Sequence, residues 1–167
     1  MSKPFSKELY EECNLVAMNV AAELLTSLGN GNFYRIDKPI SEQVEAYKSH
    51  DFVITYIKNN QSIYVEVEKK NVWTLSGKWQ GFNTIDVPYR KSESNADLFV
   101  MINKHNDTAA ISRMENVKAS PVESKRTIYT TDEQFFKVEL SSFKFYGKQF
   151  NKWNEFKPLK TRTNESR

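Results

Sequence analysis

The chain carries an alternating stretch near its middle, Tyr64-Val65-Glu66-Val67-Glu68-Lys69-Lys70. Successive side chains of a β-strand point to opposite faces, so Glu66, Glu68 and Lys70 share one face and the valines share the other. An apolar run at residues 51–57 begins with Asp51, and a polar, asparagine-containing segment separates the two stretches. The pattern predicts a β-hairpin of residues 51–57 and 62–70. Because paired strands lie about 4.8 Å apart, we expect Asp51 to lie near the two glutamates.

The remaining pattern predicts one long helix and several further strands. Residues 6–28 repeat apolar side chains at helical spacing, with Leu9, Cys13, Val16, Val20 and Leu24 as the expected stripe. Strands are expected at residues 84–88, 96–102, 108–114 and 135–140, and a short helix near 41–45; residues 33–36 are expected to form a short strand or an extended lead-in. This order predicts an α/β or α+β fold, in which helices flank a mixed central β-sheet and the first helix packs on it.

Length and composition are those of a globular protein with one domain. The chain has 167 residues, of which 39% are hydrophobic and 27% charged, with a net charge of +3. We expect residues 1–155 to form the domain and residues 156–167 to be a basic, flexible tail. The single cysteine, Cys13, excludes an intrachain disulfide and suits the cytoplasm; its ordinary role is that of a small core residue. No apolar run is long enough to predict a membrane span.

The acidic and basic side chains of the hairpin have the chemistry of a metal-dependent hydrolase. Asp51, Glu66 and Glu68 offer the oxygen ligands that Mg²⁺ or Mn²⁺ prefers. Lys70 lies on the same face as Glu68 and is the candidate for stabilising charge in a transition state. Carboxylates this close repel one another without a cation, so one of them should bind a proton more readily than usual.

These residues resemble the motif of the PD-(D/E)xK nuclease superfamily. Asp51 matches the first acid, with His50 where the motif has proline, and Glu68-Lys69-Lys70 matches the (D/E)xK triplet. The resemblance covers roughly residues 10–115. This segment is similar to small nuclease-fold proteins that occur often in bacteriophage genomes. It implies a restriction-endonuclease-like core, catalytic roles for Asp51, Glu68 and Lys70, and a Mg²⁺ or Mn²⁺ site at Asp51, Glu66 and Glu68. A second register, with Glu66 and Glu68 as the pair, stays open; the first retains the lysine.

Several residues outside the hairpin are candidates for contact with nucleic acid. Arg90 and Lys91 follow a strand end and have the charge to bind phosphate. Residues 137–167 contain eight basic and three acidic residues, and aromatic residues alternate with Lys144, Lys148 and Lys152. Such a mixture can stack on bases and pair with phosphates, although the same aromatics could instead cover the core.

Weaker candidates are the further carboxylates Glu12, Glu23 and Glu45, which are ordinarily surface charges, and Gln80 as a substrate contact. The two histidines, His50 and His105, have no partner at the spacing of a zinc site.

Three functions remain open at this level. The first is a DNA nuclease, phage or mobile-element encoded, which by fold analogy could act as a homodimer. The second is an inactive module of the same fold that binds nucleic acid or a protein, within a virion or a transcription complex. The third is a structural protein, because a Glu-Val-Glu-Lys-Lys run is also typical of the solvated face of an edge strand.

Overall fold

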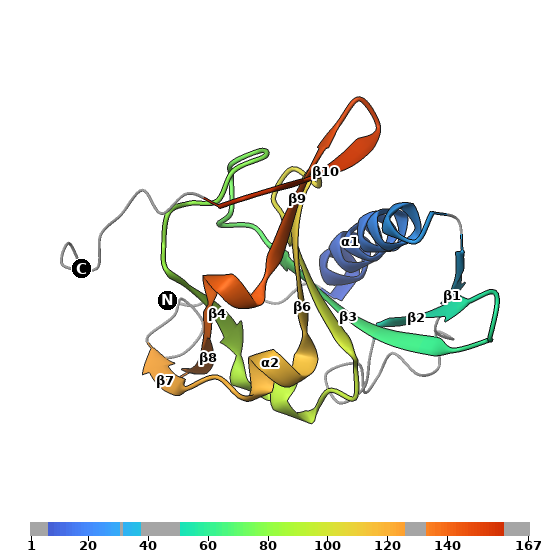
Figure 1. Cartoon of the computed structure of the whole chain (residues 1–167). Coiled ribbons are helices and arrows are strands. Elements are labelled where there is room, and N and C mark those ends of the chain that lie inside the picture. The colour runs from blue at the N-terminus through green and yellow to red at the C-terminus, as the bar shows by residue number, and fades with distance from the viewer. Residues whose placement is uncertain (1–6, 31, 38–50, 126–132, 159–167) are drawn as a thin grey trace.

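The computed structural model describes residues 7–30, 32–37, 51–125 and 133–158, and it contains helices, 3₁₀ turns and ten strands (Figure 1). In chain order the elements are α1 (Lys7–Leu28), β1 (Phe33–Asp37), β2 (Phe52–Tyr56), β3 (Ser62–Lys70), β4 (Thr84–Pro88), the 3₁₀ helix η2 (Tyr89–Glu93), β5 (Leu98–Asn103), β6 (Thr108–Arg113), α2 (Met114–Lys118), β7 (Val122–Lys125), β8 (Glu133–Glu139), the 3₁₀ helix η3 (Leu140–Ser142), β9 (Lys144–Gln149) and β10 (Lys152–Phe156).

The hairpin of β2 and β3 forms as the alternating sequence predicts. The two strands are antiparallel, with Phe52 opposite Val65 and Thr55 opposite Ser62. Asn60 in the connecting turn has a φ of 56°, a left-handed conformation that asparagine tolerates well. The register places Asp51 just beyond the end of the paired region, beside the middle of β3.

One seven-stranded sheet organises the described part of the chain, in the order β1-β2-β3-β5-β6-β9-β10. β3 and β5 are parallel and the other neighbours are antiparallel, so the sheet is mixed, as expected. Helix α1 packs on one face of this curled sheet (Figure 1), against a core that includes Val65, Val67, Val100 and Ile102.

The opposite face of the sheet is covered by a second, antiparallel sheet of order β4-β8-β7. Between the two sheets lies a second core, in which Phe99, Met101 and Phe145 from the large sheet meet Val87 and Val138 from the small one. The expectation of flanking helices therefore holds for one face only, because strands and the five-residue α2 cover the other. The architecture is α+β with a mixed sheet.

The buried face of α1 matches the predicted stripe in part, because Leu24 is buried and Val20 packs against the core. Ala17, Ala21 and Leu24 are fully buried, whereas Val16 is 42% exposed. Small alanines let the helix backbone approach the sheet closely, so the contact face is centred on them instead of on the larger β-branched side chains. The side chain of Cys13 and the short helix expected near 41–45 lie outside the described residues.

The sequence pattern also misses the last hairpin. Residues beyond Gly147 look basic and polar, yet β9 and β10 pair with each other and β9 pairs with β6. The described chain stays in the sheet as far as Phe156, one residue beyond the expected domain boundary, and residues 159–167 of the expected tail lie outside the described part. No described helix has the length and apolar character needed to cross a membrane.

Candidate functional site

Asp51 lies at the point where β2 stops pairing with β3. Its backbone N–H donates to the carbonyl of Val65 at 2.8 Å, and its Oδ2 accepts from the backbone N–H of Val67 at 2.6 Å. The side chain thus accepts the hydrogen bond that the backbone of β2 no longer accepts from β3. This hydrogen bond explains why an aspartate that is only 7% exposed is tolerated there. The result is a fixed, buried carboxylate beside β3.

Glu66 lies on the face of β3 opposite α1 and is only 1% exposed. Its Oε2 forms an ion pair with the ammonium of Lys91, and its Oε1 lies 3.4 Å from the hydroxyl of Ser94. Lys91 belongs to η2, which follows β4 directly, and is itself 7% exposed. The cluster therefore joins β3 of the large sheet to η2, the segment that follows β4 of the small sheet.

Glu68 and Lys70 continue the same face toward the end of β3, as the alternation predicts. Glu68 is half-buried, and its Oε2 is buried without a hydrogen-bond donor among the described residues. Lys70 donates from Nζ to the backbone carbonyl of Asp86 in β4 at 3.0 Å. The face changes along the strand from fully buried Glu66 to the partly exposed Glu68 and Lys70, so the cluster opens to solvent at this end.

The electrostatics follow from this burial. Loss of solvation raises the pKa of Glu66 to about 7, and the neighbouring charges of Asp51 and Glu68 add to the rise, while Lys91 opposes it. Burial alone would lower the pKa of Lys91, but Glu66, Glu68 and Asp51 outweigh it and hold that pKa above its ordinary value. Lys91 is thus the common counterion of all three acids. Glu66 is therefore the carboxylate of the cluster that binds a proton more readily than usual, as the sequence predicts for one of them.

The fit of a divalent cation rests on the donor chemistry of these acids. Three carboxylates provide hard oxygen ligands, and the unpaired buried Oε2 of Glu68 is a donor atom with no other described use. Within the described ranges, however, no three His, Cys, Asp or Glu side chains converge closely enough to enclose a metal ion. In this conformation Lys91 supplies the neutralising charge, so a cation at Glu66 would require the lysine to move.

The residues expected to contact nucleic acid are distributed differently from the prediction. Lys91 is not at the surface, because it is drawn into the acidic cluster. Arg90, its neighbour in η2, is 55% exposed and lies 3.8 Å from Glu133. Lys144 and Lys152 are exposed, whereas Lys148 pairs with Glu23 at 2.5 Å.

The weaker candidates do not join the cluster. Glu23 belongs to α1 and pairs with Lys148 and with the indole N–H of Trp153, on the other side of the sheet. Gln80 is half-buried in the loop before β4. Glu45, His50 and the side chain of Glu12 lie outside the described residues.

The sequence did not predict that two residues, Lys91 and Ser94, belong to the cluster. Ser94 gave no signal at all, and Lys91 was recognised only as a charge that follows a strand end. Their contact with Glu66 depends on how β4 and η2 cross the large sheet, which no local spacing reveals. A pairing across 25 residues of sequence requires the tertiary structure.

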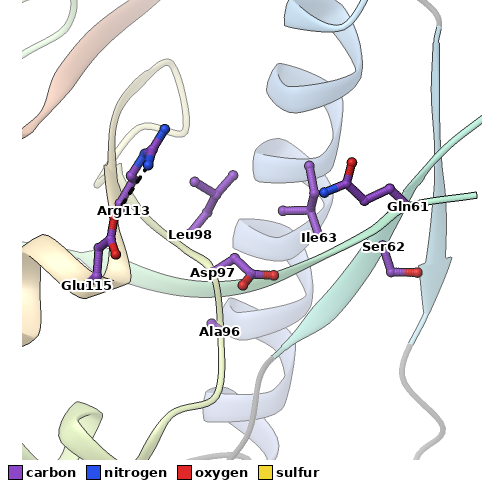
Figure 2. A pocket seen from close by; sticks show the side chains of 8 residues that line it. All are labelled: Gln61, Ser62, Ile63, Ala96, Asp97, Leu98, Arg113 and Glu115. Carbon is purple, nitrogen blue, oxygen red and sulfur yellow. Dashed lines mark hydrogen bonds and ion pairs between the residues drawn. The ribbon is translucent and has the colours of Figure 1, made fainter. Parts of the chain in front are cut away.

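A separate cavity of about 480 Å³ lies at the opposite end of β3 and is lined by Gln61, Ser62, Ile63, Ala96, Asp97, Leu98, Arg113 and Glu115 (Figure 2). Asp97 uses its Oδ2 to accept from the backbone N–H of Tyr64 at 2.9 Å, and Arg113 pairs with Glu115 at 3.4 Å. The Asp97 contact joins the segment before β5 to β3. The cavity contains none of Asp51, Glu66 and Glu68, so it is not the candidate site.

Comparison with known protein families, with curated proteins and with solved structures finds no match to this chain.

Proposed function

We propose that this protein is a metal-dependent nuclease that hydrolyses phosphodiester bonds in DNA. The observation that carries the proposal is the acidic cluster of buried Asp51 and Glu66 with half-buried Glu68, whose buried Oε2 has no hydrogen-bond partner among the described residues. Ionised carboxylates are costly to bury, and like charges on one strand face are unfavourable. A buried acid whose pKa is strongly raised, as that of Glu66 is, is typical of functional sites.

The cluster has the composition that the proposed reaction requires. Asp51, Glu66 and Glu68 are the residues that would hold Mg²⁺ or Mn²⁺. Such an ion would polarise the phosphate and lower the pKa of a bound water. Asp51 is already oriented by the Val67 N–H, and the buried Oε2 of Glu68 has no described hydrogen-bond partner. This division of roles supports a PD-(D/E)xK assignment with Glu68-Lys69-Lys70 as the triplet.

Two lysines are available to stabilise charge on the phosphate. Lys70 reaches the open end of the cluster, where its ammonium has one described partner, the Asp86 carbonyl. Lys91 lies deeper and neutralises Glu66. We assign the contact with the reacting phosphate to Lys70, and we assign to Lys91 the positioning of the acids.

The remaining parts of the proposal concern the setting. Exposed Arg90, Lys144 and Lys152 would contact the DNA backbone, and two copies of the chain would let the enzyme cut both strands. A restriction-endonuclease-like core and phage origin follow from the same resemblance, and a cytoplasmic location follows from the single cysteine; all three belong to the same proposal.

The test is cleavage of supercoiled plasmid and single-stranded DNA in Mg²⁺ or Mn²⁺. Glu68→Gln and Lys70→Ala should each lower the rate by about 100-fold or more, as expected for groups that stabilise transition-state charge. Glu123→Gln, on an exposed position of β7, is the matched control and should cut like the wild type. Wild-type protein that cuts neither substrate with either metal, or variants that retain full activity, would refute the assignment.

A specific observation favours a second candidate, a non-catalytic binding module. The Lys91–Glu66 ion pair already neutralises the deepest acid, and the described residues do not enclose a metal. Such a module would bind nucleic acid or a protein with unchanged affinity in the presence of chelator. It would show no increase in thermal stability on addition of Mn²⁺, whereas a metal site would.

A further inference from the structure

Phe150 is the most exposed large apolar side chain in the described part of the protein. It is 90% exposed and occupies the turn between β9 and β10. Gln149 pairs with Lys152, so the turn consists of Phe150 and Asn151 alone. The hairpin projects beyond the rest of the large sheet (Figure 1), and its aromatic tip therefore faces solvent instead of the core.

The backbone at this tip disfavours phenylalanine. Phe150 and Asn151 have φ values of 52° and 64°, as a two-residue hairpin turn of the right twist requires. The other described non-glycine residues with positive φ are all asparagines, namely Asn30, Asn60, Asn106 and Asn151. A bulky side chain in this region is a true outlier. Local strain combined with an exposed ring indicates a role outside the fold.

The hairpin has the charge and the anchoring of a contact element. Residues 144–157 contain four lysines and one glutamate. One residue pair below the Gln149–Lys152 pair, Lys148 pairs with Glu23 of α1 at 2.5 Å, and the indole N–H of Trp153 donates to the same carboxylate at 3.2 Å. These contacts fix the hairpin to α1 close to its tip, while the neighbouring Lys152 stays exposed.

The register of the sheet relates the tip to the acidic cluster. Glu68 pairs with Met101, Met101 with Ala110, and Ala110 with Phe145, so one row crosses from the cluster to β9. Phe150 lies five residues further along the chain and three strands away, which corresponds to about 20 Å in a regular sheet. A DNA segment of one or two helical turns can span this distance.

We propose that the β9–β10 hairpin is a DNA-binding finger, in which Phe150 stacks on or between bases and the exposed Lys144 and Lys152 pair with flanking phosphates. Inserted apolar side chains unstack base steps in this way, and aromatic rings stack on any base. The choice of DNA as the occupant rests on the proposed nuclease function. The exposed ring, the strained turn and the basic strands are independent of it.

The test measures binding in EDTA, so that cleavage does not contribute. Phe150→Asn should weaken binding of a fluorescein-labelled DNA duplex by about tenfold or more, the loss expected for one stacking contact. Phe150→Tyr should bind within about twofold of the wild type, since it keeps the ring. Ile57→Asn, which changes another exposed apolar residue at the far side of the sheet, should leave binding unchanged.

A second readout excludes a folding defect. Asparagine suits the turn better than phenylalanine, so Phe150→Asn should raise Tm by about 2–4 °C while it weakens binding. Wild-type protein should increase the fluorescence of a 2-aminopurine placed in the duplex, and Phe150→Asn should not. Weaker DNA binding together with a higher Tm supports the proposal. If Phe150 had only a structural role, the substitution would not weaken binding while it raises stability.

Several results would overturn the proposal. One is that Phe150→Asn binds duplex as tightly as the wild type. Alternatively, the wild type could bind phosphatidylserine vesicles through Phe150 and not bind DNA. The nuclease proposal is tested separately, by Glu68→Gln in the cleavage assay. If the finger proposal is wrong, the cleavage result still stands. If the wild type does not cleave DNA but Phe150→Asn loses DNA binding, the finger proposal stands and the nuclease proposal is wrong.

Discussion

The ammonium of Lys91 and the carboxylate of Glu66 form an ion pair in the interior, between a strand of the large sheet and the 3₁₀ helix that follows β4. Their side chains are 9% and 2% exposed, so water screens the pair very little. Asp51 and Glu68 also act on the same lysine. The pair is therefore the centre of a four-residue charge cluster, and removal of either partner leaves an uncompensated charge.

Replacement of Lys91 by methionine should destabilise the protein strongly. Breaking a buried ion pair by removing one partner costs about 3–5 kcal/mol, because the other charge stays desolvated. Urea unfolding should show this loss as a lower midpoint, whereas Lys144→Met, at an exposed position, should change stability by no more than about 0.5 kcal/mol. The double variant Glu66→Met/Lys91→Met should be more stable than Lys91→Met. Equal stability of the wild type and Lys91→Met would contradict the buried pair.

The pH dependence of stability should carry the signature of Glu66. Its pKa rises from 4.5 to about 7 in the folded protein, chiefly because of burial. Between these values the folded state holds a proton that the unfolded state has released, so the contribution of Glu66 to stability falls as pH rises toward 7 and then stays constant. The free energy of unfolding of the wild type relative to Glu66→Gln should therefore decline from about pH 4.5 to 7. A difference that is flat across this window would show that Glu66 titrates normally.

Much of the cluster could be predicted from sequence, and the missing part has a clear physical cause. The alternation at Glu66, Glu68 and Lys70 fixes a shared strand face, and a short turn fixes Asp51 beside it. Both are local properties of a hairpin. Lys91 and Ser94 reach the cluster only because β4 packs over the large sheet, and that long-range arrangement leaves no periodic trace in the sequence.

The same distinction applies to the fold. Long, regular patterns gave α1, the β2–β3 hairpin and the buried strand β5. The β9–β10 hairpin escaped detection because its turn, Phe150-Asn151, lacks the glycine that ordinarily marks such a turn. The small strand β7 escaped as well, since all four of its residues are exposed and carry no alternating apolar pattern.

Glu68→Gln should separate metal binding from stability. Removal of one negative charge from the cluster should leave the metal-free protein as stable as the wild type or more stable, because the acids repel each other. A metal at 100 times its Kd stabilises the folded state by about 2.7 kcal/mol, or roughly 5–10 °C in Tm for a chain of this size. Differential scanning fluorimetry with Mn²⁺ should show this rise for the wild type and for Glu123→Gln, and not for Glu68→Gln. An equal rise in all three proteins would place the metal elsewhere.

Asn103 should hold the loop before β4 in place. It is fully buried, and its amide donates to the Leu75 carbonyl at 2.9 Å and to Asp107 Oδ1 at 2.8 Å. Its Oδ1 accepts from the backbone N–H groups of Asp107 and Thr108, both at 3.0 Å. Asn103→Ala leaves several of these groups unpaired and should cost about 2–4 kcal/mol, while Asn154→Ala, at an exposed position, should cost little.

Hydrogen exchange gives the local readout for that variant. The N–H of Gly77 donates to the Thr108 hydroxyl at 2.7 Å, next to the Asn103 contacts. The Gly77 amide should exchange faster in Asn103→Ala by a larger factor than the α1 amides, which change only as far as global stability falls. Uniformly faster exchange would show instead that the variant lowers global stability alone.

The most direct test of the central claim is a crystal structure of the protein soaked in Mn²⁺, with anomalous data collected for the metal. The account predicts an anomalous peak within coordination distance, about 2.2 Å, of Glu68 Oε2, with Asp51 or Glu66 as a second ligand and with Lys91 displaced from Glu66 if Glu66 is that ligand. An acidic cluster that binds no Mn²⁺ at saturating concentration and keeps the Lys91–Glu66 pair unchanged would contradict it.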